Sequence, residues 1–307
     1  MTRRCSSTGL ARIDVLAAVF LGCLLILLVP VLFAKPREQS MRRLCAANLA
    51  QIGKAMLIYA NDYEDDLPRA GGRTTVWRAT PNWKATDRRA AFWLSADGSG
   101  GTASITASFY LLVKYYGLPV RLFVCKADKG TTEFKLPEHM DVPISFQLDD
   151  AWDFGGLDES YKHCSYAYHI PYGLYSLSTS NDPNMAVAAD RNPWIRSPAA
   201  DPADFTVFRP GREVIGGLGT SDQACRGNSI THQRDAQNVL FLDGRVSFQK
   251  RAYCAMGKDN IYTISRMAIE GDPWGILPVP GPVCSPANRK DSLLVHDPGP
   301  LVSDERR

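Results

Sequence analysis

The segment RRLCAANLAQIGKAMLIYANDYEDDLP occupies residues 42–68, and its pattern predicts an amphipathic helix. Apolar side chains recur along it at spacings of four and three residues: Cys45, Leu49, Ile52, Met56 and Tyr59. Side chains at this spacing lie on one side of a helix, and the alanines between them favour helical backbone. Pro68 disfavours helical geometry just before it, so we expect the helix to end by Asp66. The apolar stripe should be buried against a globular body.

Upstream of this segment, residues 15–34 form a run without any charge, VLAAVFLGCLLILLVPVLFA. About 20 apolar residues at ~1.5 Å each cover the ~30 Å core of a bilayer. We therefore expect a transmembrane helix at 10–34 that continues as the amphipathic helix at 35–66. A cleaved secretory signal fits less well, because the run exceeds the usual ~7–15 apolar residues. Leu32 and Phe33 also stand where a signal peptidase needs small residues.

The residues before the apolar run form the order Gly9-Leu10-Ala11-Arg12-Ile13-Asp14 after a basic leader at 1–9. This order resembles the N-terminus of bacterial type IV pilins and type II secretion pseudopilins. The resemblance implies that a prepilin-type peptidase cuts between Gly9 and Leu10. It also implies that Asp14, five places past the cut, pairs with the new α-amine of a neighbouring subunit, since an unpaired charge at membrane depth is costly. The family usually has Phe, an uncharged residue and Glu where this chain has Leu10, Arg12 and Asp14.

The remaining composition describes a folded domain. The formal net charge of the 307 residues is +3, without the basic stripe that nucleic acid requires, so no nucleic-acid partner is expected. Residues 67–272 have enough apolar content for a core and should form one globular α+β domain. Residues 273–307 are rich in proline and polar residues, which predicts a loosely ordered tail.

The cysteines leave two interpretations open. Six lie beyond the apolar run: Cys45, Cys125, Cys164, Cys225, Cys254 and Cys284. Three disulfides in an oxidising compartment and free buried thiols are both compatible with this even number. No CxxC pair occurs, so we expect no zinc site and no cofactor. Basic residues flank the apolar run on both sides, and charge alone leaves its orientation open.

Short elements separated by glycine and proline are expected within the domain. A helix is predicted at 106–116, with Thr106 or Ser108 as N-cap and Gly117 just past its end. Segments with β-branched or aromatic residues and flanking turn formers predict three strands: Val120–Cys125, Ser165–His169 and Met185–Ala189. Three tryptophans in the loop-rich region 71–101 should anchor long connections: Trp77, Trp83 and Trp93.

The clearest hairpin signal is the segment Asn238–Phe248. Two apolar strands flank Asp243-Gly244, a dipeptide suited to a tight turn that needs a positive φ. Substituting Gly244 by a β-branched residue should therefore be costly. From the sequence alone we expect Gly244→Val to cost more stability than His232→Ala, and neither change to remove a metal.

The C-terminal half resembles pilin-like bacterial proteins that carry a His-x9-Asp-Gly signature. Here ten residues separate His232 from Asp243-Gly244. Further phrases carry the resemblance along nearly the whole chain: Cys45 to Gly53, Phe123 to Asp128, Ser165 to Tyr168, Ala189 to Pro193 and Asp259 to Thr263. The resemblance implies a single-pass inner-membrane protein with a periplasmic domain, in which a long N-terminal helix packs on a mainly antiparallel sheet. The implied partners are the membrane, the prepilin-type peptidase and other pilin-like subunits.

Enzymatic interpretations of the same residues are weaker. His232, Asp235 and Asp243 are residue types that serve acid–base or metal chemistry. The hairpin explains Asp243 as a turn residue and His232 as a hydrogen-bonding residue at the start of a strand, so we interpret the signature as structural. Cys225 near His232 is a possible nucleophile pair, although a disulfide or a buried thiol explains this cysteine better.

Two other catalytic motifs are incomplete. Ser221 and Ser229 lack the GxSxG elbow of a serine hydrolase. The glycine-rich segment 216–219 lacks the Lys-Ser/Thr of a phosphate loop, so we interpret it as a turn. The sequence therefore predicts a protein that is not an enzyme.

Calcium ligands are present without a recognisable motif. The acidic stretches Glu64-Asp65-Asp66 and Asp149-Asp150-Ala151-Trp152-Asp153 offer hard oxygen ligands. Neither has the Asp-x-Asp-x-Asp-Gly order of a strong site, and solvated charge explains both. A weak calcium site stays open.

The expected function is that of a structural subunit or accessory component in a pilus-type or secretion assembly. The alternative is an anchored binding module, whose exposed aromatic residues and loops hold a carbohydrate or another envelope component. An anchored hydrolase ranks behind both.

Overall fold

The computed structural model describes residues 12–136, 142–211, 221–267 and 271–299. The chain divides into two units, Met1–Met41 and Arg42–Arg307, which are described separately. The helices are α1 (Arg12–Asp62), α2 (Arg88–Phe92), α3 (Ile105–Tyr116) and α4 (Asp222–Cys225). The strands are β1 (Val76–Trp77), β2 (Thr102–Ala103), β3 (Tyr166–His169), β4 (Ala186–Asp190), β5 (Gln237–Phe241), β6 (Val246–Gln249) and β7 (Leu294–Val295). Short 3₁₀ helices are η1 (Val120–Phe123), η3 (Ser160–Lys162), η4 (Phe205–Val207), η5 (Ile230–His232) and η6 (Met256–Lys258).

The first unit consists, where described, of the beginning of α1. Gly9 and Leu10 lie outside the described residues, and Asp14 lies in α1 with its side chain outside the described part. Within the part of the chain that the structure describes, no helix is both long and apolar enough to cross a membrane.

In the second unit, the rest of α1 is a core helix. All five residues of the predicted stripe, from Cys45 to Tyr59, are buried, which confirms the amphipathic prediction. The helix ends at Asp62, four residues before the predicted end at Asp66. The reason is local, because Glu64 and Asp65 adopt left-handed backbone with φ of 52° and 65°.

The second unit is α+β and contains a five-stranded sheet in the order β6-β5-β4-β3-β7. Every neighbouring pair in this sheet is antiparallel, as the sequence predicts. The predicted strands at 165–169 and 185–189 correspond to β3 and β4, and the predicted hairpin corresponds to β5 and β6. A second, two-stranded sheet pairs β1 with β2 in parallel.

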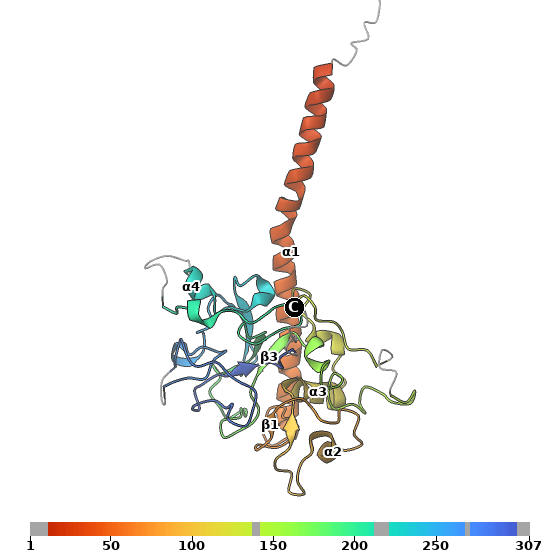
Figure 1. Cartoon of the computed structure of the whole chain (residues 1–307), viewed down its shortest axis with the longest axis vertical. Helices are drawn as coiled ribbons and strands as arrows, with labels where there is room; N and C mark the ends of the chain where they lie inside the picture. Colours follow the sequence, from red (N-terminus) through yellow and green to blue (C-terminus); the bar gives the residue numbers. More distant parts are fainter. Residues whose placement is uncertain (1–11, 137–141, 212–220, 268–270, 300–307) are drawn as a thin grey trace, which may run out of the picture. The chain divides into compact units, whose positions relative to one another are not determined.

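Alternate side chains of the five-stranded sheet enter two separate cores, as strand geometry requires. Tyr166, Tyr168 and Leu240 enter the core that contains α1 and α3. Ala167 and Val239 enter a second core, formed with the loops that follow β4 and β6. Both faces of the sheet are therefore covered, one by α1 and α3 and the other by loops together with α4. In Figure 1, α3 and α4 lie on opposite sides of the view.

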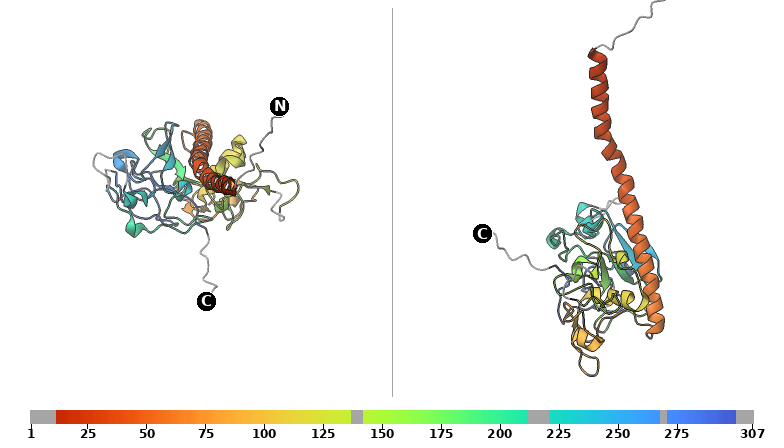
Figure 2. Two further views of the ribbon diagram at one scale, coloured as in Figure 1. Left: turned by 90° about the horizontal axis from the view of Figure 1, so that it is seen from above. Right: turned by 90° about the vertical axis from the view of Figure 1, so that its right-hand side faces the viewer.

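The last part of α1 runs beside the β5–β6 hairpin (Figure 2). The approach is close at Gly53, where an added Cβ would lie 2.7 Å from Leu240 Cδ1. Glycine at this position therefore allows the helix to pack directly on β5. Further along, Leu57 lies beside Gly244 in the hairpin turn.

The hairpin turn matches its prediction. Gly244 has a φ of 84°, and its N–H donates to the carbonyl of Phe241 at 2.9 Å. The Asp243 carboxylate accepts the N–H of Arg245 at 3.0 Å and forms an ion pair with the Arg245 guanidinium. Asp243 is therefore a turn residue.

α3 confirms the helix predicted at 106–116, but its N-cap residue differs from the prediction. Ser104, not Thr106 or Ser108, accepts the N–H of Ala107 at 2.9 Å. Ser108 instead lies inside the helix and accepts the N–H of Ala70. Gly117 ends the helix with a φ of 61°, as predicted.

Three other predictions were wrong. Val120–Cys125 is not a strand, because Pro119 starts the 3₁₀ helix η1, and Leu122 N–H donates to the Pro119 carbonyl. Trp77 and Trp83 are buried anchors, whereas Trp93 is 69% exposed.

The third wrong prediction concerns the tail. Residues 273–299 belong to the folded unit, because Leu294 and Val295 form β7 and pair with His169 and Tyr168. The two apolar side chains at this edge of the sheet are fully buried, and that burial outweighs the proline-rich composition around them. Beyond residue 299 the predicted tail lies outside the described residues.

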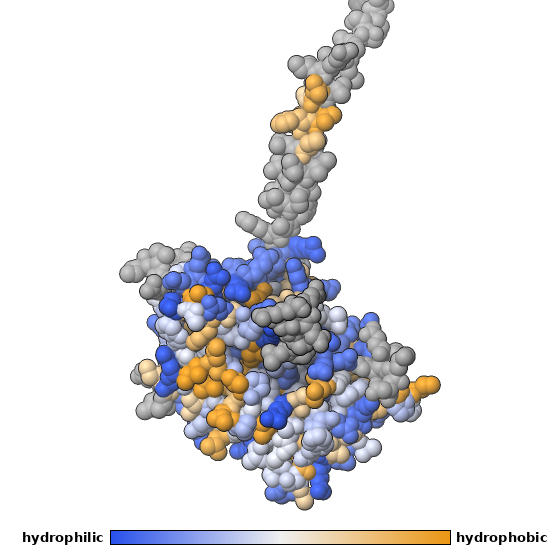
Figure 3. Space-filling view, in the orientation of Figure 1, coloured by the Kyte–Doolittle hydropathy of each residue, from blue (hydrophilic) through white to orange (hydrophobic). Residues whose placement is uncertain are grey.

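The surface of the second unit is mostly polar on the face shown in Figure 3, with apolar patches between the polar regions. Exposed apolar side chains include Leu44 and Ile58 on α1 and Val279 and Val283 before β7.

Candidate functional site

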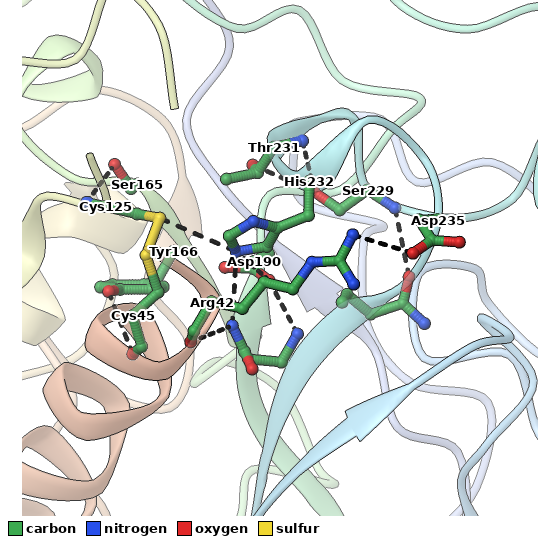
Figure 4. Close-up of polar contacts among 12 residues, drawn as sticks. Arg42, Cys45, Cys125, Ser165, Tyr166, Asp190, Ser229, Thr231, His232 and Asp235 are labelled. Atoms are coloured by element: carbon green, nitrogen blue, oxygen red, sulfur yellow. Dashed lines mark hydrogen bonds and ion pairs between the residues drawn. A yellow bond between two sulfur atoms is a disulfide. The ribbon is translucent and has the colours of Figure 1, made fainter. Parts of the chain in front are cut away.

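The signature histidine, His232, is the centre of a buried group that we call the sulfur–histidine cluster: Cys45, Cys125, Asp190 and His232 (Figure 4). Each member comes from a different element. Cys45 lies in α1, Cys125 follows η1, Asp190 ends β4, and His232 ends η5. None of the four is more than 1% exposed.

The two cysteines of the cluster form a disulfide across a sequence separation of 80 residues. The bridge attaches α1 to the segment after η1. Nearby hydrogen bonds hold the same junction, since Asn48 Nδ2 donates to the Val124 carbonyl and the Cys125 N–H donates to Ser165 Oγ.

This bridge resolves part of the open question on the cysteines. One disulfide is present among the described residues, while Cys164, Cys254 and Cys284 are thiols. Burial raises the pKa of each of these three thiols to about 12. They are therefore protonated and poorly nucleophilic at neutral pH.

The His232 ring directs Nε2 toward the other members of the cluster. This nitrogen lies 3.9 Å from Cys125 Sγ and 3.5 Å from Asp190 Oδ2. Asn238 Nδ2 lies 3.4 Å from the same nitrogen and also donates to the Arg42 carbonyl. His232 Nε2 thereby lies close to three segments: the residues after η1, the end of β4, and β5.

The two oxygens of the Asp190 carboxylate have different surroundings. Its Oδ2 accepts the Asn238 N–H at 2.7 Å, whereas Oδ1 has no hydrogen-bond partner among the described residues. Burial raises the pKa of Asp190 to about 6, and the neighbouring His232 acts in the opposite direction. An unsatisfied buried carboxylate oxygen is costly and requires an explanation.

Local sequence explains how His232 reaches this position. Ser229 caps η5, with its Oγ accepting the Thr231 N–H. Gln233 and Arg234 then reverse the chain through left-handed backbone, with φ of 60° and 61°. Gln237 Nε2 fastens the loop by donating to the carbonyls of Gln249 and Arg251 at 2.9 and 2.8 Å.

The burial of the cluster decides what chemistry it can perform. The four side chains are at most 1% exposed, so a molecule from solvent reaches them only if the surrounding chain moves. The ligand atoms of Cys45, Cys125 and His232 lie within 4.8 Å of one another, and no other such His, Cys, Asp or Glu group occurs in the described residues. These are donor types that bind zinc.

The structure does not bring the other sequence candidates into this cluster. Asp235 forms an ion pair with Arg42 at 2.8 Å, and Asp243 lies in the hairpin turn. Ser221 caps α4 and Ser229 caps η5, so both serines have structural roles. The glycine-rich segment 216–219 lies outside the described residues.

Several carboxylates of the acidic stretches bind protein partners. Asp66 pairs with Arg69 and Arg73, and Asp65 accepts Thr179 Oγ1 at 2.8 Å. In the second stretch, Asp153 is buried and accepts Thr80 Oγ1 at 2.8 Å, while Asp150 accepts the Gln147 N–H. Neither stretch presents its carboxylates as a group to one ion.

The phrases that carried the family resemblance meet around β4. Arg191 forms a buried ion pair with Asp128 at 2.8 Å, which joins two of them. Asn192 Nδ2 donates to the Tyr262 carbonyl, and Tyr262 Oη donates to the Asp190 carbonyl, which joins a third. Three of the five quoted phrases are therefore joined in one buried network.

Sequence reasoning singled out His232 but missed its neighbours. Asp190 and the two cysteines stood in other quoted phrases, without any spacing that linked them to the histidine. His232 and Cys125 are 107 residues apart. The absence of a CxxC pair argues only against a zinc site made from one short segment. In the fold, cysteine and histidine side chains from distant segments come together.

A second feature is an open pocket of about 510 Å³ that we call the aromatic cleft. Its lining includes the rings of Trp77, Trp93 and Tyr161. Trp77 Nε1 donates to Asp297 Oδ1 at 3.0 Å, and Asp297 also accepts two N–H groups at the start of α3. Trp93 is exposed and has a left-handed φ of 53°, a conformation that is uncommon for a bulky residue.

Comparisons with protein-family models, with curated proteins and with solved structures found no match to this chain. A proposal of function therefore draws on the sequence and on the geometry described above.

The burial of His232 reverses the expected order of two substitutions. His232→Ala should lower the free energy of unfolding by about 3 kcal/mol, because it leaves a cavity and removes a polar neighbour of Asp190. Gly244→Val should cost roughly 2 kcal/mol through its positive φ, since an added Cβ meets only Leu57 Cδ1 at 3.8 Å. Urea unfolding of both variants measures the difference. A larger loss in Gly244→Val would restore the order expected from sequence.

Proposed function

We propose that this protein is a membrane-anchored, pilin-like structural subunit or accessory component of a pilus-type or secretion assembly. The observation that carries the proposal is the burial of the α1 stripe from Cys45 to Tyr59 against an antiparallel sheet. In the sequence, this core helix directly follows the apolar run at 15–34. An apolar run that leads into a core helix supports an anchored subunit whose domain is built on its anchor.

The exposed side of α1 supports association with other subunits. Leu44 and Ile58 are 50% and 54% exposed. They are 14 residues apart, nearly four turns, so they lie about 40° from each other around the helix. A neighbouring helix that packed along this side would bury both.

Several further features fit this proposal. The Cys45–Cys125 disulfide suits an oxidising compartment, in agreement with a domain on the periplasmic side of the inner membrane. Asp14 would pair with the α-amine of a neighbouring subunit once cleavage after Gly9 had exposed Leu10. The partners of this proposal are the membrane, the prepilin-type peptidase and other pilin-like subunits.

Processing tests the first step. We expect the mature wild-type chain to begin at Leu10, and Gly9→Leu to retain residues 1–9. N-terminal sequencing and intact mass of protein from its native membrane measure this. Gly22→Leu is the matched control, because Gly22 lies within α1 with nothing within 4 Å of an added Cβ. Wild-type protein that starts only at Met1 or Thr2 would exclude cleavage.

Assembly is tested separately. Chemical cross-linking in native membranes should give a ladder of multiples of the chain, and Ile58→Glu should shorten it by placing a charge on the exposed side of α1. Lys290→Glu, an exposed charge reversal outside α1, serves as the control. A chain that is monomeric at its native level would count against a subunit role.

The aromatic cleft favours a second candidate, a module that binds carbohydrate. Sugars stack on exposed aromatic rings, and Trp93 presents such a ring at the edge of a 510 Å³ pocket. The neighbouring Trp77 ring is fixed by its hydrogen bond to Asp297, which gives the pocket a rigid wall.

This candidate predicts that Trp93→Ala weakens glycan binding at least tenfold, a loss of about 1.4 kcal/mol. Binding to a panel of envelope glycans by the detergent-solubilised chain measures it. Val283→Ala, at a residue 87% exposed and outside the cleft lining, is the control. No binding by the wild type, or equal binding by the two variants, would remove this candidate.

A further inference from the structure

The sulfur–histidine cluster has two features that a structural disulfide alone does not explain. Asp190 Oδ1 is buried without a partner among the described residues. In addition, His232 directs the same ring nitrogen toward a cysteine sulfur and a carboxylate oxygen. Both features are expected where side chains surround a cation.

The two distances from His232 Nε2 to neighbouring ligand atoms are close to those of a tetrahedral ion site. Zinc bonds of ~2.0–2.3 Å place neighbouring ligand atoms roughly 3.3–3.8 Å apart. His232 Nε2 lies 3.5 Å from Asp190 Oδ2 and 3.9 Å from Cys125 Sγ. The Cys45, Cys125 and His232 ligand atoms all lie within 4.8 Å of one another. Asp190 lies outside that group, so a set of two sulfurs, one nitrogen and one oxygen requires the two bonded sulfurs to separate and the Asp190 carboxylate to move closer to them.

We propose that Cys45, Cys125, His232 and Asp190 hold one zinc-class divalent ion when both cysteines are thiols, and that the disulfide and the bound ion are alternative states of this cluster. Sulfur and imidazole ligands select zinc over calcium or magnesium. Asn238 Nδ2 keeps its bond to the Arg42 carbonyl when His232 Nε2 turns its lone pair to the ion.

The zinc-bound form and the disulfide form interconvert by thiol oxidation and disulfide reduction. A newly made chain carries two thiols, which release two protons as Zn²⁺ binds the two thiolates. A small disulfide oxidant converts the two thiolates to the protein disulfide, is itself reduced to two thiols with uptake of two protons, and frees the ion. In the reverse direction, a phosphine and one water reduce the protein disulfide to two thiols and yield the phosphine oxide.

The test uses the full chain in detergent. Protein reduced with a phosphine under anaerobic conditions should bind about one Zn²⁺ per chain and release about two protons. Co²⁺ in its place should give the thiolate-to-metal absorption and the intense visible bands of a tetrahedral site. The disulfide form should bind neither ion, because its sulfurs are no longer thiolates.

Variants assign the ligands. Cys45→Ser, Cys125→Ser and His232→Gln should each weaken binding at least a hundredfold, and Asp190→Asn about tenfold. Cys164→Ser and His169→Gln are matched controls, since they change buried residues of the same types outside the cluster. Near-ultraviolet circular dichroism establishes that each variant is folded. If a cysteine variant fails to fold, Asp190→Asn still tests the site, because asparagine has nearly the volume of the native side chain.

Three outcomes would overturn the proposal. The first is a reduced wild-type chain that binds no ion, whether it stays folded or not. The second is binding that survives in Cys45→Ser or Asp190→Asn with unchanged affinity. The third is equal loss in the Cys164→Ser control, which would assign the ion to other thiols.

Discussion

Ile52→Asp should lower the free energy of unfolding of the second unit by about 4 kcal/mol and leave little folded protein at 37 °C. Ile52 is fully buried in the middle of the α1 stripe, in the core between α1 and the sheet. The substitution removes an apolar side chain from this core and places a carboxylate there. Among the described residues Arg191 is the one buried arginine or lysine, and it already pairs with Asp128, so the new charge would stay unpaired or the carboxylate would be protonated at a similar cost.

Urea unfolding of the full chain in detergent, followed by tryptophan fluorescence, measures this effect. Gln51→Asp is the matched control, because it introduces the same charge at the exposed neighbouring position of the same helix. The control should change the free energy of unfolding by less than about 1 kcal/mol. If both variants unfold at the same urea concentration as the wild type, α1 is not the core helix.

The second large effect should come from loss of the disulfide. Cys45→Ala combined with Cys125→Ala should lower the free energy of unfolding by about 4.5 kcal/mol, because the bridge closes a loop of 80 residues that otherwise gains entropy in the unfolded chain. Measured losses for native bridges range over about 2–5 kcal/mol. The experiment contains a chelator, so that a bound ion does not contribute.

Two comparisons make this prediction specific. Reduced wild-type protein in the same chelator should lose a similar amount, whereas Cys164→Ala, which removes a buried thiol outside the bridge, should lose about 1 kcal/mol. A double variant that is as stable as the oxidised wild type would show that the bridge does not constrain the unfolded chain.

Sequence patterns predicted the elements whose signals are local. The stripe from Cys45 to Tyr59 repeats at helical spacing, and Asp243-Gly244 marks a turn between two apolar strands, so α1 and the β5–β6 hairpin were found. The segment at 120–125 has a strand-like composition, but Pro119 and the packing of Phe123 determine a 3₁₀ helix instead. β7 has only two residues and pairs with a strand far away in the chain, which no local pattern reports.

In the candidate site, too, the sequence identified the residue with a local signal and missed those that depend on the assembled fold. His232 was found because its spacing to Asp243-Gly244 resembles a signature, although the structure separates their roles. Asp190 was missed because only the pairing of β4 with β5 brings its carboxylate next to His232 and to the Asn238 N–H. The ligand set follows from the sheet order, which is a property of the assembled fold.

The position of β7 has a consequence for how the protein is made. Its residues Leu294 and Val295 pair with β3 more than a hundred residues earlier, and Asn192 binds the Leu294 carbonyl. A ribosome must therefore have synthesised residue 295 before the sheet can close, whereas residues 45 and 125 can meet much earlier. Until then the growing chain exposes the edge of β3, an unpaired strand edge that invites aggregation and chaperone binding. Oxidation of Cys45 and Cys125 can thus precede folding of the whole unit.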